Sequence, residues 1–163
     1  MARRATDAET RVDREDHGAI RLWLRMLATN RLVETRTRRL LQERYATTLP
    51  RFDLMAQLER APKGLKMGEL SRRMMVTGGN VTGITDGLAE EGLVERVADP
   101  ADRRAWLVRL TPAGRRSFAA MAEEHERWIV ESFRELSGRE MATMAALLAR
   151  LKTHVRSLEE RDA

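Results

Sequence analysis

The sequence predicts a mainly α-helical protein with a small β hairpin, and patterns between residues 66 and 110 carry this prediction. Apolar residues recur at helical spacing over 67–75 and again over 80–91. Two short runs of β-forming residues follow, at 93–97 and 105–110, and a hydrophilic, turn-forming segment separates them. A helix, a tight turn, a second helix and a hairpin with a basic tip make up a winged helix-turn-helix, a unit that reads duplex DNA.

Length and composition limit the alternatives. A chain of 163 residues supports one domain with one sizeable core. Lys and Arg outnumber Asp and Glu 30 to 25, which gives a net charge of +5 and fits a polyanionic partner. The sequence contains no cysteine, which excludes a disulfide, a thiolate zinc site and a thiol redox switch. No apolar run reaches the roughly 18 residues that cross a bilayer, and no secretory signal is present, so we expect a cytoplasmic, nucleoid-associated protein.

The N-terminal part predicts a flexible tail over 1–15 and then one long helix over about 16–45. The tail has arginines but no apolar periodicity, and the alternative for it is an arm that contacts DNA. At 1.5 Å per residue the helix spans roughly 40 Å, a length typical of helices that pair with another subunit. Arg36, Arg38 and Arg39 cluster on its second half, either as a solvated face or as contacts to ligand phosphate or DNA.

A second helix is expected from Pro50 to about residue 60, because proline suits the first turn of a helix and residues 61–64 end it. Leu65 is expected to add one short strand to the wing sheet. The apolar side chains that give this helix a buried face are Phe52, Met55 and Leu58.

The recognition helix is the second helix of the predicted helix-turn-helix. Val81, Ile84 and Leu88 form its core-facing stripe, and Thr77 can cap its start. Asparagine can pair with adenine, and a threonine methyl can touch thymine. The residues expected to face DNA are Thr77, Gly78, Gly79, Asn80, Thr82 and Thr85, with Arg72 and Arg73 of the preceding helix near phosphates.

Glycines are unusually frequent in this helix. Gly78, Gly79, Gly83 and Gly87 each cost roughly 1 kcal/mol relative to alanine in a helix interior. The compensation is either close helix packing, which we prefer for Gly87, or close approach of the helix backbone to a ligand such as phosphate.

Two more helices are expected after the wing. Thr111-Pro112 is a good cap and first turn for the first of them, and Ser137-Gly138 ends it. The last helix, up to about residue 160, carries a broad apolar stripe at spacings of three and four. With the first helix this stripe predicts a homodimer across a palindromic operator. The expected interface residues are Ile20, Leu24, Met141, Met144, Leu148, Leu151, Val155 and Leu158.

The segments GELSRRMMVTGGNVTGITDGLAEEGLVER and DPADRRAWLVRLTPAG resemble the MarR (multiple antibiotic resistance regulator) family of bacterial transcription factors. The resemblance covers about residues 17–158. It implies a single MarR-like domain over 16–163, with the winged unit at about 50–110 between dimerisation helices at about 16–45 and 112–160. It also implies a repressor that a small effector releases from DNA. Several relatives carry arginine where this chain has Gly83. DNA recognition by this chain is therefore expected to depend less on base readout and more on the wing and on DNA shape.

By the same resemblance, Asp102 holds Arg104, whose guanidinium enters the minor groove. Arg103 is the alternative inserting residue, or it binds backbone phosphate. Without the resemblance, residues 102–104 are equally well an ordinary charged hairpin loop.

The family commonly binds a small aromatic acid or its coenzyme A thioester in a crevice between the dimer helices and the winged lobe. Methionine adapts to flat ligands and arginine binds carboxylates, although each apolar side chain of the crevice can also simply fill the core. The expected lining residues are Trp23, Arg25, Met26, Arg38, Met55, Leu58 and Met74.

Catalytic, metal and cofactor functions are not expected. His17, His125 and His154 lie far apart in the sequence and lack the neighbouring ligands of a metal site. Gly78-Gly79-Asn80 lies between helices and lacks the lysine of a phosphate-binding loop. The remaining alternatives are a transcriptional activator, a ligand-independent architectural DNA-binding protein and, less favoured, a winged helix used for protein interaction.

Overall fold

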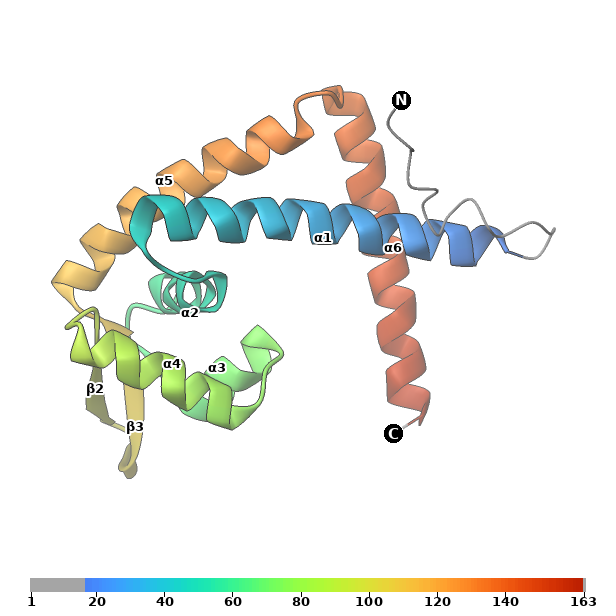
Figure 1. Cartoon of the computed structure of the whole chain (residues 1–163). Helices are drawn as coiled ribbons and strands as arrows, with labels where there is room; N and C mark the ends of the chain where they lie inside the picture. Colours follow the sequence, from blue (N-terminus) through green and yellow to red (C-terminus); the bar gives the residue numbers. More distant parts are fainter. Residues whose placement is uncertain (1–16, 163) are drawn as a thin grey trace. The chain divides into compact units, whose positions relative to one another are not determined.

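The computed structural model of the protein describes residues 17–162 and is mainly helical with one small sheet (Figure 1). It divides into two compact units, with the boundary after Glu126. The first unit holds α1 (Gly18–Tyr45), α2 (Leu49–Glu59), β1 (Leu65–Lys66), α3 (Met67–Met74), α4 (Gly78–Glu90), β2 (Val94–Asp99), β3 (Asp102–Leu110) and the first part of α5 (Pro112–Phe133). The second unit holds the rest of α5 and α6 (Gly138–Asp162).

This order confirms the predicted winged helix-turn-helix. Most helices begin and end within two residues of the expected positions, but α5 ends at Phe133, earlier than the break expected at Ser137-Gly138. The wing differs most, because β2 and β3 extend until Asp99 pairs with Asp102, leaving only Pro100 and Ala101 between the strands. Most of the expected 99–104 loop is therefore strand. The predicted N-terminal tail lies outside the described residues.

Helices α1, α2 and α5 support the helix-turn-helix. The Tyr45 hydroxyl at the end of α1 donates to the Ala120 carbonyl of α5 at 3.1 Å. One residue earlier, an Arg44 guanidinium nitrogen lies 3.6 Å from the Glu124 carboxylate of α5. These contacts hold the end of α1 against α5, and α2 follows directly in the chain.

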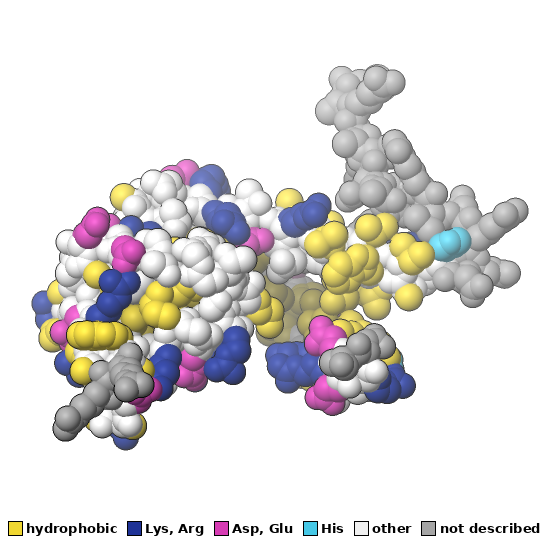
Figure 2. Space-filling model, turned by 90° about the horizontal axis from the view of Figure 1, so that it is seen from below, with side chains coloured by type: hydrophobic (Ala, Val, Ile, Leu, Met, Phe, Trp, Pro, Cys, Tyr) yellow, Lys and Arg dark blue, Asp and Glu magenta, His cyan; other side chains and the backbone are white. Residues whose placement is uncertain are grey.

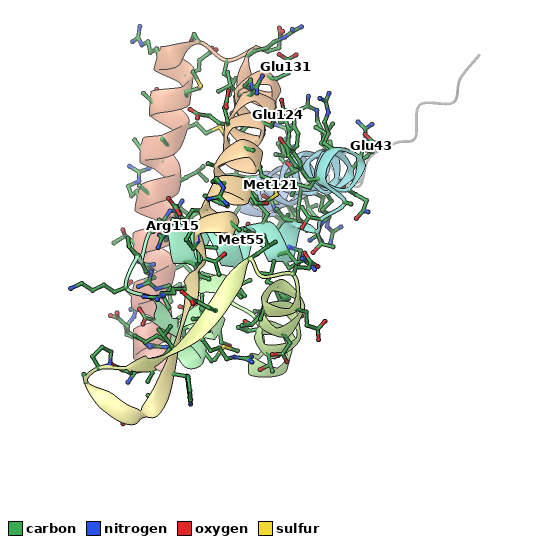
Figure 3. The ribbon with its side chains drawn as sticks, turned by 90° about the vertical axis from the view of Figure 1, so that its left-hand side faces the viewer. Glu43, Met55, Arg115, Met121, Glu124 and Glu131 are labelled. Atoms are coloured by element: carbon green, nitrogen blue, oxygen red, sulfur yellow. The ribbon has the colours of Figure 1, made fainter. Side chains whose placement is uncertain are left out.

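One apolar core joins these helices to the winged unit. Met55 of α2 and Met121 of α5 are both buried in it (Figure 3). Burying a side chain of this size contributes about 1.5–3 kcal/mol, so α2 and the recognition helix are held by many such contacts. The largest fully buried apolar side chains are Leu41, Leu54, Met55, Leu58, Leu70, Val81, Leu88, Val108 and Leu110.

The sheet is antiparallel, with strand order β1-β3-β2. Leu65 pairs with Val108, which confirms the short strand expected at this position. Gly64 approaches β3 so closely that a Cβ atom there would lie 2.9 Å from the Val108 carbonyl oxygen, and its φ is +97°. Only glycine meets both conditions, so Gly64 allows β1 to join the sheet.

The start of α5 is attached to the base of the wing. The Gly114 amide donates to Thr111 Oγ1 at 2.9 Å, which confirms the predicted cap. The Thr111 amide in turn donates to the Leu93 carbonyl at 3.1 Å. A Cβ atom on Gly114 would lie 1.9 Å from that carbonyl oxygen, so the junction requires glycine.

The second unit begins α6 with a reciprocal cap. The Ser137 amide donates to the Glu140 carboxylate at 2.8 Å, and the Glu140 amide donates to Ser137 Oγ at 3.3 Å. Hydrogen bonds from Ser137 hold the pKa of Glu140 below its ordinary value. None of residues 138–161 is buried in the single chain, including the whole apolar stripe.

Candidate DNA-binding interface

The turn between α3 and α4 has a fixed geometry. Ser71 Oγ donates to the Val76 carbonyl at 2.5 Å, across the turn. Met75 adopts the left-handed conformation, with φ 55° and ψ 39°. For a residue other than glycine this costs about 1–2 kcal/mol. Its side chain is 89% exposed, so packing within the chain does not offset that cost.

Helix α4 has one buried face and one open face. Val81 and Leu88 are fully buried and Ile84 is half-buried, as the stripe predicted. Thr77 occupies the N-cap position and is exposed, but its side chain makes no capping hydrogen bond. The exposed residues in the first half of α4 are Gly78, Gly79, Asn80, Thr82 and Gly83.

Thr85 does not belong to the open face, so the prediction that it reads bases is wrong. It is fully buried, and its hydroxyl donates to the Val81 carbonyl at 2.8 Å. The hydroxyl is satisfied within its own helix, which lets a polar residue occupy a core position. Thr82 also donates to the carbonyl four residues earlier, Gly78 at 3.0 Å, yet its side chain remains exposed.

The glycines of α4 divide into two groups. A Cβ atom on Gly78, Gly79 or Gly83 would meet nothing within 4 Å. Close packing inside the chain therefore does not explain them. A Cβ atom on Gly87 would lie 3.6 Å from Arg51 Nη1 of α2, which fits the preferred packing role for Gly87.

Two ion pairs attach α4 to its neighbours, and sequence analysis did not single out their residues. The Arg51 guanidinium of α2 pairs with Glu91, which caps the end of α4. Arg96 of β2 pairs with Asp86 of α4. The partners are ten or forty residues apart, so no local pattern relates them.

The wing hairpin projects beyond α4 (Figure 1). At its turn the Asp99 carboxylate accepts the Ala101 amide at 2.9 Å. Asp102 begins β3, and its side chain is exposed. Arg103 and Arg104 follow it in β3, but their side chains lie outside what the structure describes. The holding of Arg104 by Asp102 stays a prediction.

Trp106 is a further wing residue that sequence analysis passed over. It pairs with Ala98 and is 58% exposed. Since side chains alternate along a strand, Trp106 lies on the same sheet face as Val108 and Leu110, which are buried toward the helices. The wing thus presents a large aromatic side chain on its helix-facing side, beyond the end of the core.

Basic side chains occur on the side of the molecule that carries the wing tip, mixed with apolar and acidic ones (Figure 2). Arg72 and Arg73 on α3 are exposed, as a phosphate contact requires. Arg73 lies 2.6 Å from Glu69, one turn earlier on the same helix. Exposed pairs of this kind are weak, so the pair leaves Arg73 able to meet a phosphate.

The residues expected to line an effector crevice are not equivalent in the structure. Met55 and Leu58 are fully buried in the core, whereas Trp23 is 59% exposed and Arg25 is exposed on α1. Met26 and Met74 are half-buried. Arg38 is paired with Glu34 at 2.5 Å.

The Arg38 pair lies close to Asp53 of α2. Burial raises the pKa of the Asp53 carboxyl, the positive charge of Arg38 opposes that rise, and the carboxylate of Glu34 adds to it. Arg38 therefore lies among acidic groups, although its exposed pair with Glu34 is as weak as that of Arg73 with Glu69.

An open groove of about 540 Å³ occurs elsewhere on α1. It contains none of the side chains predicted for the crevice. Its lining residues are Ala28, Arg31, Leu32, Thr35, Arg36 and Arg39.

The residues expected to form the dimer interface are largely exposed in the single chain. Ile20 on α1 is 47% exposed, whereas Leu24 is half-buried. The stripe residues of α6 are each between 38% and 44% exposed; they are Met141, Met144, Leu148, Leu151, Val155 and Leu158.

Within residues 17–162 no group of three or more His, Asp or Glu side chains is arranged to hold a metal ion. None of the described helices combines the length and apolar composition that a membrane span requires.

Comparison with known proteins identifies the fold and the family. Residues 47–105 match the model of the MarR family. The transcriptional activatory protein BadR of Rhodopseudomonas palustris is 30% identical over 126 residues, which cover 76% of this chain and 71% of BadR. The crystal structure of a MarR family transcriptional regulator from Silicibacter pomeroyi is 33% identical, with a TM-score of 0.75 over 87% of this chain and 99% of that one.

A more distant structure shares the fold. Sco3205 of Streptomyces coelicolor, a MarR family transcriptional regulator solved in complex with DNA, is 19% identical, with a TM-score of 0.75 over 86% of this chain and 89% of its own. The open face of α4 and the projecting wing fit the fold that these relatives share. The chain belongs to the MarR family of DNA-binding transcriptional regulators.

Proposed function

We propose that this protein is a homodimeric repressor that binds a palindromic operator and leaves it when a small aromatic acid, or its coenzyme A thioester, binds. The observation that carries the DNA-binding part is the open face of α4. Its first half exposes three glycines and two polar residues on a helix whose other face is locked into the core. A surface of this kind admits DNA closely, and no packing contact among the described residues requires it.

In this proposal α4 enters the major groove. Asn80 and Thr82 are the exposed polar side chains that reach base edges, and Arg72 and Arg73 bind phosphates. The wing places Arg104 in the minor groove with Asp102 orienting it; Arg103 is the alternative inserting residue. Trp106 adds an apolar surface on the helix-facing side of the wing, where it meets the sugar edge of the DNA backbone.

Operator binding by wing variants tests the wing contact. Arg104→Ala should weaken binding by about 1–3 kcal/mol, or about 5- to 150-fold, and lower the salt slope by roughly one unit. Asp102→Ala should do less, since it only positions the contact. Arg109→Ala is the matched control, because Arg109 lies on the same strand but is paired with Glu95 at 2.7 Å. If Arg104→Ala and Arg109→Ala weaken operator binding equally, with folds intact by circular dichroism, the assignment of Arg104 to the minor groove is contradicted.

The dimer is supported by the stripe on α6. Its residues alternate spacings of three and four, the repeat with which two helices form a continuous seam, and a monomer leaves them exposed to water. Leu151→Glu with Val155→Glu should give monomers or insoluble protein without operator binding. Arg156→Glu, off the stripe on the same helix, should leave both properties unchanged. A monomeric wild-type mass by light scattering at micromolar concentration rules the dimer out.

The effector part of the proposal is supported by the groove on α1. It is an open surface along one face of α1, where Arg31, Arg36 and Arg39 stand beside Leu32. Guanidinium groups bind carboxylates and phosphates, and both occur in an aromatic acyl thioester of coenzyme A. Coupling of about 1–3 kcal/mol would lower operator affinity roughly 5- to 150-fold.

Titration of operator complexes with benzoates, hydroxycinnamates and their thioesters tests the effector. Release that Arg31→Ala abolishes supports the groove, whereas release that persists in Arg31→Ala points to the crevice with Trp23 and Met26. If none of the compounds changes operator binding at millimolar concentration, the chemical class is wrong.

A transcriptional activator is the second candidate, because the relative BadR is named a transcriptional activatory protein. The setting proposed for either function is the cytoplasm. Deletion of the gene distinguishes the two, since transcription next to the operator rises when a repressor is lost and falls when an activator is lost. A ligand-independent architectural protein predicts no change with any effector.

A further inference from the structure

We propose that Lys66 is a positioning residue for the wing. Its ammonium group bridges Asp99 and Asp102 and so fixes the position of the hairpin relative to the helix-turn-helix. The inference rests on the proposed contact of the wing with DNA. Lys66 belongs neither to the open face of α4 nor to the wing arginines, and the family resemblance assigned it no role.

The backbone of Lys66 is held on two sides. In β1 it pairs with Leu107 of β3, next to the close approach of Gly64 to the same strand. It is also the N-cap residue of α3, the first helix of the helix-turn-helix. Lys66 therefore belongs to the sheet and to the helix-turn-helix at once, and its side chain extends from a fixed base.

Its ammonium group lies between two carboxylates of the wing turn. Nζ is 3.1 Å from Asp99 Oδ2 and 3.9 Å from Asp102 Oδ2. Asp99 is only 8% exposed, stands where the β2–β3 register is irregular, and pairs across the hairpin with Asp102. The contact thus joins the two carboxylates that flank the turn.

Asp99 is kept ionised for this contact. The amide of Ala101 and then the ammonium of Lys66 hold the pKa of Asp99 below its ordinary value. The carboxylate is consequently charged at every pH at which DNA binding is measured, and the bridge does not depend on pH in that range.

The bridge also changes the charge that the wing presents to DNA. Residues 99–104 contain two aspartates and two arginines, so the turn by itself carries no net charge. Two carboxylates at the tip repel phosphates. The Lys66 cation neutralises part of that field and so reduces the repulsion of the polyanion.

The competing role for Lys66 is a direct contact to phosphate, because its side chain is half exposed. The two roles differ in how the effect of a substitution depends on other residues. A positioning residue acts through the groups that it holds, whereas a direct contact acts independently of them.

Operator binding in two double-mutant cycles separates these roles. Lys66→Met keeps the aliphatic stem and removes the charge, and it should weaken binding about 5- to 30-fold, less than or similar to Arg104→Ala. In an Asp99→Asn or an Arg104→Ala background the same change should weaken binding less than about threefold. Lys66→Arg should restore most of the affinity. Lys63→Met, at an exposed lysine in the preceding turn, is the control and should have little effect.

Each outcome decides one point. An equal effect of Lys66→Met in all backgrounds means a direct phosphate contact and overturns the positioning role. No effect of Lys66→Met, with Arg104→Ala still harmful, also overturns it and leaves the proposed function standing. No effect of Arg104→Ala removes the proposed wing contact itself. Thermal unfolding of each variant separates these results from loss of the fold.

Discussion

Replacing Gly83 by alanine should move stability and DNA binding in opposite directions. Gly83 lies in the middle of α4, and a Cβ atom there meets nothing within 4 Å. Alanine is favoured over glycine in a helix interior by about 0.8–1.0 kcal/mol. For a cooperative unit of about 110 residues this gain raises the melting temperature by about 4 °C.

The opposite effect is expected on the operator. If DNA approaches the open face of α4 as closely as the glycines permit, an added methyl group overpacks that contact by about 1–3 kcal/mol. Binding should then weaken about 5- to 150-fold. Differential scanning calorimetry gives the first quantity, and fluorescence anisotropy with labelled operator gives the second.

Gly87→Ala is the matched control on the same helix. Its Cβ would make an ordinary contact of 3.6 Å with Arg51 of α2, away from the open face. It should stabilise the helix by a similar amount without changing operator affinity. If Gly83→Ala stabilises the protein and leaves affinity unchanged, DNA does not approach this face closely, and the explanation of the glycines is refuted.

Three further predictions address the supporting structure. Thr85→Val should leave operator affinity within about twofold, because the side chain is buried and satisfied by its own helix, and anisotropy measures this. Gly114→Ala should destabilise the fold by about 3 kcal/mol or more in denaturant titrations, because its Cβ would lie 1.9 Å from the Leu93 carbonyl oxygen. Burial lowers the pKa of His125, whose ring lies 4.7 Å from that of Phe52. The unfolded state therefore takes up protons first, so the melting temperature should fall as pH drops below about 6.5, and less so in His125→Phe.

Periodicity was sufficient to predict the helices and the order of the winged unit. Each helix carries one apolar stripe at helical spacing, whether the stripe is buried, as in α2 and α4, or exposed in the single chain, as in α6. The extra strand at Leu65 and the cap at Thr111 were also predicted and are confirmed. Strand ends were harder, because the pairing of Asp99 with Asp102 depends on a turn that the polar sequence 99–104 does not distinguish from a longer loop.

The DNA-binding residues could be predicted only where the local sequence pattern determines whether a side chain is exposed. Asn80 and Thr82 are exposed as expected, but Thr85 has the same residue type as Thr82 and lies on the opposite side of the helix. A threonine that satisfies its hydroxyl within its own helix can occupy the core, so its chemistry alone did not indicate its side. Arg51 and Lys66 escaped notice for a different reason. Their partners are distant in sequence, and only the assembled fold brings them together.

Several positions of the winged helix-turn-helix are unfavourable for the isolated fold, and a DNA partner would explain them. Three open-face glycines forgo helix stability, Met75 holds a strained backbone with an exposed side chain, and Trp106 exposes an aromatic ring on the wing. The hydrogen bonds of the turn hold Met75 in its conformation, but no packing contact within the described residues calls for the three glycines, and the side chains of Met75 and Trp106 remain mostly exposed. All three belong to α4, to the turn before it or to the wing, the elements that contact DNA in the proposed function. The same kinds of cost also occur outside the winged unit, at the left-handed Ala46 and at the exposed Trp23 and Leu32 of α1. Such a cost therefore indicates a binding residue in this protein only where it coincides with an element that the fold places at the DNA-binding surface.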